Sequence, residues 1–457
     1  MLTFAPDLTK VGYTSTKCKQ VCLCIWPELP LHPNLNIHNI NKNEIISNVM
    51  KGIHVTSEIK PLKKVLLHRP GRELLNLTPN TLEELLFDDI PYLKVAEEEH
   101  DAFSQVLRDN GVEVVYLEDL MAQVLDISPE IREQFLRQFI EEAGICATKY
   151  HDIIYNYLNG ITSSKELVLK TMEGIYLQDL PRDPREVENS LVDQVRGDSR
   201  FVVKPMPNLY FTRDPFACIG TGVSINRMFS VTRCRETIYG DYIFKYHPDF
   251  KEVEHYYDRD LPYRIEGGDI LNLNEHTLAI GISQRTEPDG IELIAKNIFA
   301  NGNAAIDTVL AIHIPETRAF MHLDTVFTQI DHDKFTVHPG ILGPLEVFKL
   351  TRGEGEEIKL ERKEETLEEI LAEALGLQHV KLIKCGGGDL ITAEREQWND
   401  GSNTLCIAPG KVIVYERNNV TNALLRDEGI TVLEIPSSEL SRGRGGPRCM
   451  SMPLWRD

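Results

Sequence analysis

Glu266-Gly267-Gly268-Asp269 contains a signature that returns along the chain. An aspartate closes an apolar run, and a second strand-like run with an arginine follows. Three copies are Arg213-Asp214, Gly267-Gly268-Asp269 and Gly387-Gly388-Asp389, followed by Arg233, Arg285 and Arg417, and His322-Leu323-Asp324 lies where a further copy is expected. The four aspartates are separated by 55, 55 and 65 residues. This spacing predicts a radial repeat of strand–strand–helix–strand modules whose acidic loops converge on a central axis.

Units of helix, glycine and strand support this α/β repeat. Thr366 and Glu369 form a capping box, Gly376 ends the helix that they begin, and 380–383 is strand-like. The same order is predicted for the helix 102–109 with the strand 112–117, and for the helix 424–428 with the strand 430–435.

Four segments differ in pattern. Residues 1–49 are low in complexity and predict a disordered extension, with translation expected to begin at Met50. Residues 50–117 predict the first module. Residues 118–197 predict an inserted helical subdomain, with a capping box at Ser163 and Glu166 and one apolar face at Ile131, Phe135, Phe139 and Ile140. Residues 198–457 predict the remaining modules.

The composition limits the functional class. The formal net charge of −21 argues against nucleic acid or an anionic membrane as the main partner, and it leaves room for a cationic small molecule. No apolar stretch approaches the length of a transmembrane helix. The nine cysteines, an odd number, predict reduced thiols in the cytoplasm. Cys18, Cys22 and Cys24 lack the further ligands of a zinc site and are interpreted as unligated thiols.

A thiol lies in a glycine-rich segment near the end of the sequence. Cys449 follows Arg442, Arg444 and Arg448 within Ser441-Arg-Gly-Arg-Gly-Gly-Pro-Arg-Cys449. Nearby cations favour the thiolate over the thiol, and glycines let a ligand approach the backbone. On composition alone, a nucleophile and an incidental cysteine in a flexible basic tail are equally good interpretations.

Carboxylates supply a complementary set. Paired carboxylates match the fixed N–H groups of a guanidinium, and Asp214 and Asp324 are the candidates for such a pair. Glu266 and Asp269 are candidates for supporting positions, although a Gly-Gly-Asp sequence can also be a turn whose aspartate caps the backbone. That structural interpretation is preferred for Asp389.

His322 is the candidate acid–base residue. On a strand its side chain would share a face with that of Asp324, two residues on. His313, His332 and His338 compete for the role. A metal-dependent hydrolase is an alternative, because His322-Leu323-Asp324 and Asp331-His332-Asp333 offer metal ligands.

Taken together, several segments closely resemble the arginine deiminase family. They are Ser57-Glu-Ile-Lys-Pro-Leu-Lys-Lys-Val-Leu-Leu-His-Arg-Pro-Gly71, Leu85-Leu-Phe-Asp-Asp89, Phe211-Thr-Arg-Asp-Pro215, Glu266-Gly-Gly-Asp269, Met321-His-Leu-Asp324 and Arg442-Gly-Arg-Gly-Gly-Pro-Arg-Cys-Met-Ser-Met-Pro453. The resemblance runs from about Met50 to the C-terminus and keeps the order of the motifs. It implies a five-bladed α/β-propeller, the pentein fold, with a helical insertion after the first module.

The resemblance also implies roles for individual residues. Cys449 attacks the guanidinium carbon of arginine, Asp214 and Asp324 hold its nitrogens, and His322 moves the protons, oriented by Glu266 with Asp269 in its shell. The residues implied around the substrate are Asn208, Arg233, Arg285, Asp269 and Arg444, of which Arg233 and Arg285 bind the α-carboxylate and Arg444 lies on a gating loop. The products are citrulline and ammonia, formed through a thiouronium-type intermediate without metal or cofactor. A cytoplasmic homo-oligomer is implied.

Two alternatives stay open at this point. Sister enzymes that act on agmatine or dimethylarginine, or that transfer the amidino group, share the cysteine, histidine and carboxylates. The insertion and the arginines placed for a free carboxylate favour L-arginine. A catalytically inactive arginine-binding module is disfavoured, because every catalytic position holds a competent residue type.

Overall fold

The structure, a computed structural model, describes residues 50–145, 148–181, 191–196, 201–302, 304–343, 345–354 and 357–457. The predicted extension 1–49 therefore lies outside the described residues, as do parts of the predicted insertion. The four segment boundaries given above stay predictions.

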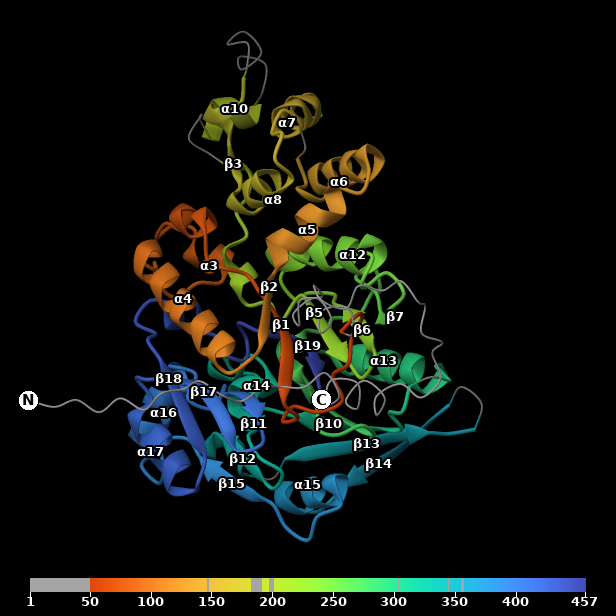
Figure 1. Ribbon diagram of the computed structural model, residues 1–457, viewed down its shortest axis with the longest axis vertical. Helices are drawn as coiled ribbons and strands as arrows, with labels where there is room; N and C mark the ends of the chain where they lie inside the picture. The colour runs from red at the N-terminus through yellow and green to blue at the C-terminus, as the bar shows by residue number, and fades with distance from the viewer. Residues whose placement is uncertain are drawn as a thin grey trace, which may run out of the picture. The chain divides into compact units, whose positions relative to one another are not determined.

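Among the described residues, five sheets share one connectivity (Figure 1). The first two strands are antiparallel, and a third returns parallel to the second. Four of these sheets are β5-β6-β7 (Phe216–Ile219, Gly222–Ile225, Glu254–Tyr257), β8-β9-β10 (Ile270–Asn272, Thr277–Ile282, Thr308–His313), β11-β12-β15 (Phe327–Gln329, Lys334–Val337, Lys381–Lys384) and β16-β17-β18 (Leu405–Ala408, Lys411–Tyr415, Thr431–Ile435).

The fifth sheet joins distant parts of the chain. Strand β19 (Met452–Arg456) pairs antiparallel with β1 (Leu62–Leu67), and β2 (Glu113–Tyr116) pairs parallel with β1. The segment that follows Cys449 therefore completes the first module. Five ββαβ modules linked in this way have the connectivity expected for a five-bladed α/β-propeller.

A helix connects the second and third strands of each module. These helices are α4 (Leu93–Asp109), α12 (Thr237–Tyr246), α13 (Pro288–Ala300), α15 (Leu367–Leu375) and α17 (Asn419–Asp427). The capping box of Thr366 and Glu369 begins α15, and Gly376 ends it with a left-handed φ of 67°. Both predictions are confirmed, because cap residues act locally. The helices α4 and α17 start earlier than predicted.

A hairpin of β13 (Glu346–Arg352) and β14 (Ile358–Lys363) extends the third module's sheet to five strands in the order β14-β13-β10-β9-β8. It lies in the chain between β12 and α15 of the fourth module, although it pairs with β10. The sequence analysis did not predict this hairpin.

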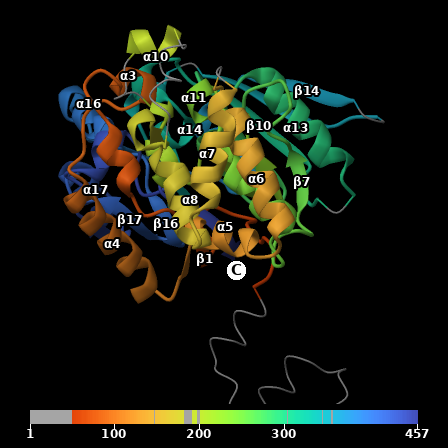
Figure 2. The ribbon, with the colours of Figure 1, turned by 90° about the horizontal axis from the view of Figure 1, so that it is seen from above.

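Helices occupy the described part of the predicted insertion. They are α5 (Leu117–Leu125), α6 (Pro129–Glu142), α7 (Lys149–Asn159), α8 (Ser164–Glu173) and α10 (Leu191–Arg196), and a short pair, β3 (Ile175–Tyr176) with β4 (Phe201–Val203), follows α8 and α10. Figures 1 and 2 show α5 to α8 side by side. Phe135, Phe139 and Ile140 are buried as predicted and Ile131 is partly buried. Ser163 caps α8 by accepting from the Glu166 backbone N–H, which is half of the predicted capping box.

Short helices occupy the connections. The α-helical ones are α3 (Leu82–Leu85), α11 (Val231–Cys234), α14 (Leu323–Val326) and α16 (Leu390–Trp398), and the 3-10 ones are η2 (Arg72–Asn76), η3 (Leu177–Asp179), η4 (Pro207–Tyr210), η5 (Gly267–Asp269), η6 (Arg318–Phe320), η7 (Pro339–Ile341) and η8 (Leu440–Gly443). Of the helices described, none is both long and apolar enough to cross a membrane.

Candidate active site

Each module contributes one polar side chain just before its first strand. Asp214 precedes β5, Asp269 precedes β8, Asp324 lies in α14 before β11, Asn403 precedes β16 and Cys449 precedes β19. Because the five modules share one connectivity, these positions are equivalent, and they bring residues far apart in sequence together. Asp389 is not the equivalent position that the spacing predicted. It is the N-cap of α16 and accepts from the Thr392 backbone N–H at 2.7 Å, which confirms its capping role.

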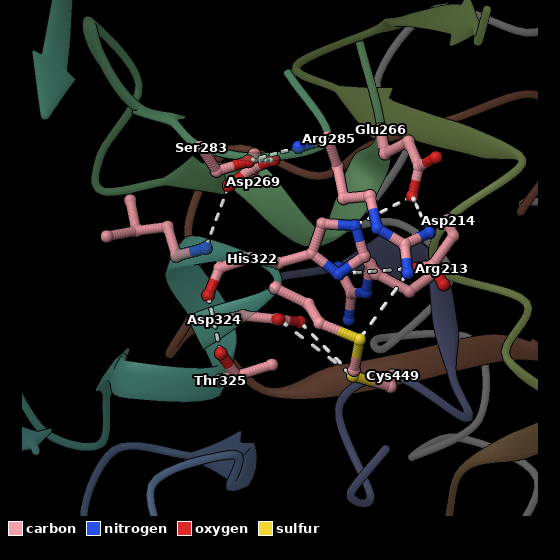
Figure 3. Close-up of polar contacts among 12 residues, drawn as sticks. Arg213, Asp214, Glu266, Asp269, Ser283, Arg285, His322, Asp324, Thr325 and Cys449 are labelled. Atoms are coloured by element: carbon pink, nitrogen blue, oxygen red, sulfur yellow. Dashed lines mark hydrogen bonds and ion pairs between the residues drawn. The ribbon is translucent and has the colours of Figure 1, made fainter. Parts of the chain in front are cut away.

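Cys449 lies against one of the predicted clamp carboxylates (Figure 3). Its Sγ is 3.6 Å from Oδ2 and 3.9 Å from Oδ1 of Asp324. Figure 3 shows His322, Asp324 and Cys449 in one cluster of side chains. The structure therefore brings the predicted nucleophile, base and clamp together, in a cluster where Cys449 has only 3% of its surface exposed.

The histidine is held between two carboxylates. His322 Nε2 is 2.7 Å from Glu266 Oε2, and its Nδ1 is 3.8 Å from Asp214 Oδ1. His322 is not on a strand as predicted: it is the N-cap of α14, and Asp324 lies in the first turn of that helix. Gly268 makes this position possible, because a Cβ there would lie 2.6 Å from His322 Nδ1.

The acid–base properties of this pair follow from burial and charge. Burial alone would lower the pKa of His322, but Asp214 and the hydrogen bond to Glu266 raise it to about 9. Burial would raise the pKa of Glu266, but Arg285 and His322 lower it to about 2. His322 is therefore an imidazolium at neutral pH, next to an ionised Glu266.

The pKa of the Cys449 thiol is shifted in the direction opposite to the one expected from the basic segment. Burial, followed by the negative charges of Asp324, Asp214 and Asp400, raises the pKa of Cys449 well above its ordinary value. Arg448 favours the thiolate as expected, but burial and the acids outweigh it, and Arg442 and Arg444 are paired elsewhere. Without substrate, Cys449 is a neutral thiol.

Each clamp carboxylate is fixed by an arginine on one oxygen. Arg233 Nη1 donates to Asp214 Oδ2 at 2.8 Å, and Arg448 Nη1 donates to Asp324 Oδ2 at 2.7 Å. Asp214 Oδ1 is buried and has no hydrogen-bond partner among the described residues. That oxygen is available to a donor that enters the site.

The residues predicted around the substrate differ in whether their hydrogen-bond donors already have partners. Arg285 is buried, and its Nε and Nη1 lack hydrogen-bond partners in the described part of the chain, although Nη1 forms an ion pair with Glu266 Oε2 at 3.7 Å. Arg233 is already shared between Asp214 and Glu236, and the amide of Asn208 donates to the Leu85 carbonyl at 2.8 Å. Arg285 is thus the predicted carboxylate-binding residue with the most unused donors.

Asp269 supports the site from behind the histidine. Its Oδ1 accepts from the Leu323 backbone N–H at 2.8 Å, and its Oδ2 accepts from the Ser283 hydroxyl at 2.7 Å. Both oxygens are therefore occupied by groups that fix the chain next to His322. This arrangement suits a positioning residue better than a direct contact with substrate.

Arg444 has a constrained backbone conformation. Its φ is 64°, a left-handed value that an arginine rarely adopts. The guanidinium stacks 3.5 Å from the centre of the Trp398 ring and lies 3.6 Å from Asp88. These contacts tie the glycine-rich segment to two other parts of the chain and leave Cys449 buried.

The sequence did not indicate two residues of the site, Glu58 and Asn403, and it indicated Arg448 only as a cation near Cys449. Arg448 binds Glu58 through Nε and Nη2, and each of these atoms lies 3.1 Å from an oxygen of the Glu58 carboxylate. The side-chain amide of Asn403 contacts Cys449 Sγ directly. Glu58 lies in a quoted family motif, and Arg448 adjoins the nucleophile, but neither position alone indicated an ion pair. Asn403 could have been found from its position just before a strand. Instead, Asp389 of the Gly-Gly-Asp motif was assigned to that position in the repeat.

A cation could also be held by part of this cluster. Asp214, Glu266 and His322 offer ligand atoms that all lie within 4.8 Å of one another. Asp331, His332 and Asp333, which the metal-dependent alternative requires, are not among the described residues grouped there.

Comparison with known proteins identifies close relatives. The family model described as arginine deiminase matches residues 83–456. The arginine deiminase of Treponema denticola is 60% identical over 410 residues, which cover 89% of this chain and 99% of that protein. The arginine deiminase of Clostridium perfringens is 55% identical over 411 residues, covering 89% of this chain and 98% of that protein.

The match to one solved structure is more distant. A DDAH from Pseudomonas aeruginosa in complex with citrulline is 16% identical, with a TM-score of 0.48, and the match covers 86% of this chain and 99% of that one.

Proposed function

Because the chain belongs to the arginine deiminase family, we propose that it hydrolyses L-arginine to L-citrulline and ammonia. The reaction makes it a hydrolase that acts on a C–N bond of a linear amidine. The observation that carries this proposal is the contact of Cys449 Sγ with Asp324, in the same buried cluster as His322 and Asp214.

The first half of the reaction forms a bond to sulfur. Asp214 Oδ1 and the Asp324 carboxylate accept N–H groups of the guanidinium and hold its carbon near Sγ. The Cys449 thiolate attacks this carbon, and the electron pair of one C=N bond moves onto nitrogen. His322, which is protonated at neutral pH, gives its proton to the leaving nitrogen, and ammonia departs.

The second half releases the product. His322 is now neutral and takes a proton from a water molecule that attacks the thiouronium carbon. The S–C bond breaks as the C=O bond of citrulline forms, and the remaining hydroxyl proton passes to Sγ. Cys449 is then again a thiol, and His322 keeps the proton that it took from water. Glu266 holds the ring in place throughout.

Substrate itself is what ionises the nucleophile in this scheme. The carboxylates of Asp324 and Asp214 raise the thiol pKa because their charges oppose a nearby thiolate. A guanidinium bound between them offsets those charges and lowers the thiol pKa. The net step is the loss of the S–H proton to solvent as arginine enters.

Replacing the nucleophile is the direct test. We expect Cys449→Ala to abolish citrulline formation in a colorimetric assay and to retain L-arginine binding in calorimetry. Cys385→Ala is the matched control, because Cys385 is also a buried free thiol. Citrulline formation by Cys449→Ala would overturn the role of Cys449, and loss of turnover in both variants would point to a folding defect.

The choice of L-arginine over related guanidines rests on the α-carboxylate. Arg285 has unused donors in a buried position, which suits an anionic carboxylate. Agmatine has no carboxylate, so it should be a poor substrate. Initial rates with L-arginine, agmatine and methylated arginines check this, and a preference for agmatine would overturn the assignment.

A metal-dependent hydrolase is the second candidate, favoured by the close grouping of Asp214, Glu266 and His322. The cysteine mechanism uses only protein groups and water, so dialysis against a chelator should leave citrulline formation unchanged. Activity that is lost on chelation and restored by a divalent cation would favour the metal-dependent reaction.

We also infer a cytoplasmic homo-oligomer. The resemblance to the family supports assembly, and the described cysteines, all free thiols, are compatible with a reducing compartment. Analytical ultracentrifugation and cell fractionation test the two inferences, and a monomer or a secreted protein would contradict them.

A further inference from the structure

We propose that Asn403 is a further catalytic residue of this site: its side-chain amide donates a hydrogen bond to Cys449 Sγ and stabilises the thiolate that attacks the substrate. The inference rests on the proposed function only through the role of Cys449 as nucleophile. Asn403 is the fifth module's residue at the position where the other modules carry Asp214, Asp269, Asp324 and Cys449.

The contacts of Asn403 fix the orientation of its amide. Oδ1 accepts from the backbone N–H groups of Arg448 and Cys449, both at 3.1 Å. Nδ2 donates to the Asp324 backbone carbonyl at 3.0 Å. Exchanging oxygen and nitrogen would place donors against donors and an acceptor against an acceptor, so only one orientation satisfies these three bonds.

This orientation directs an N–H group at the reacting atom. Asn403 Nδ2 lies 3.1 Å from Cys449 Sγ, and Asn403 is 1% exposed. The charged groups that face the thiol are Asp324, Asp214 and Asp400, which oppose a thiolate, and Arg448, which favours it. Among the described residues, the amide is the one side chain recorded as donating a hydrogen bond to this sulfur.

A donor in this place has a chemical consequence. The sulfur of a thiolate accepts hydrogen bonds more strongly than that of a neutral thiol, because the acceptor is then charged. The Asn403 bond therefore strengthens as the S–H proton leaves, and it is already in place before substrate enters. Preorganised donors of this kind act in full when they are shielded from water.

The glycine-rich segment is packed to admit this side chain. A Cβ at Gly446 would lie 2.6 Å from the Asn403 carbonyl oxygen, 2.7 Å from Oδ1 and 2.9 Å from Cβ. No side chain larger than hydrogen fits there without moving Asn403. One glycine of the Gly-Gly-Pro-Arg-Cys sequence is thus explained by the approach of Asn403 to the nucleophile.

The test removes the donor in two variants, because Asn403→Asp also adds a negative charge beside Sγ whereas Asn403→Ala adds none, and both must slow alkylation. Asn403→Asp keeps an oxygen for the two backbone N–H groups and removes the N–H group from Sγ. We expect its kcat to fall about 10²- to 10³-fold, as for the loss of one preorganised donor, with KM changed less than about threefold. We also expect alkylation of Cys449 by iodoacetamide at a fixed pH to slow about tenfold or more, since one pKa unit is a tenfold change in thiolate.

Asn422→Ala is the matched control. Asn422 is 1% exposed and donates to the Tyr415 carbonyl at 3.0 Å, away from the thiol. It should lower thermal stability without moving the alkylation profile. Asn403→Ala, which has neither a side-chain donor nor a charge, gives the comparison without the added charge and also serves if Asn403→Asp does not fold. A folded variant with the wild-type alkylation profile overturns the proposal.

The two readouts separate this inference from the proposed function, because alkylation requires no substrate. A shifted alkylation profile in an enzyme whose wild type forms no citrulline would reject arginine hydrolysis and support Asn403. Normal citrulline formation by wild type with an unshifted profile in the variant would reject Asn403 alone.

Discussion

Arg448 donates from Nη1 to Asp324 Oδ2 at 2.7 Å and binds Glu58 through Nε and Nη2, each at 3.1 Å. One buried guanidinium thus joins a carboxylate of the fourth module to the segment before β1. Because Arg448 precedes Cys449 in the chain, Arg448 anchors both the nucleophile and the Asp324 carboxylate.

Removing this guanidinium should destabilise the protein. In Arg448→Met, Glu58 and Asp324 remain buried without their partner, a situation that costs about 3–5 kcal/mol in other buried pairs. Urea unfolding measures the loss. Arg426→Met is the control, because the pair of Arg426 with Glu434 is partly exposed and should contribute at most about 1 kcal/mol. Equal losses of unfolding free energy in the two variants would contradict the stabilising role of Arg448 between Glu58 and Asp324.

Arg285 should act mainly on substrate binding. Its free donors are expected to contact the carboxylate in ground state and transition state alike, so Arg285→Ala should raise KM about 10- to 100-fold and lower kcat much less. Steady-state kinetics with L-arginine measures the split. Residual turnover of agmatine, which has no carboxylate, should be little affected. A loss confined to kcat would reject this role.

The alkaline limit of activity should be set by His322. The pKa of His322 is about 9 because Asp214 and Glu266 outweigh burial, and ammonia departs only when the ring is protonated. The rate should therefore fall as pH rises through about 9. Glu266→Gln removes a charge that raises this pKa, so the alkaline limit should move to lower pH. Glu287→Gln, which alters a carboxylate paired with Arg264, should leave the limit in place.

A second buried histidine should make stability depend on pH. His68 lies 2.8 Å from Glu118 and 3.2 Å from Glu73, and although burial opposes it, these acids raise its pKa to about 10. The folded chain then holds a proton that the unfolded chain releases above about pH 6.5. This stabilisation is complete below pH 6.5 and is lost as pH rises toward 10.

Unfolding of His68→Gln across this range measures the effect. The difference in free energy of unfolding between wild type and variant should be largest below pH 6.5 and should shrink toward pH 10. A difference that stays constant with pH would show that His68 is not protonated in the folded protein.

The sequence predicted what depends on local chemistry or on repetition. The capping box at Thr366, the end of α15 at Gly376 and the repeated strand–helix–strand modules follow from short patterns. The positions of Asp214 and Asp324 could be predicted because each lies where an apolar run begins or ends in a recurring unit. Cys449 and His322 were candidates from the residues themselves, with alternatives open, and the resemblance favoured both.

Other features depend on contacts that a linear pattern does not contain. The hairpin of β13 and β14 pairs with β10 of another module, and its insertion lengthens the step from Asp324 to Asn403. This longer spacing interrupts the repeat of the motif along the sequence. Asp389 was therefore assigned the position in the repeat that Asn403 occupies. The pKa of Cys449 was predicted in the wrong direction, because it depends on the sum of fields from Asp324, Asp214 and Asp400 and on which arginines are already paired.

The pairing of β19 with β1 has a consequence for biosynthesis. The ribosome makes β1 long before it makes Met452–Arg456, so the nascent first module must wait with one edge of its sheet unpaired. Cys449 emerges only shortly before that edge is covered. A partly translated chain should therefore have an incomplete first sheet and no thiol able to react with arginine. The chain should become active only when its last strand has paired.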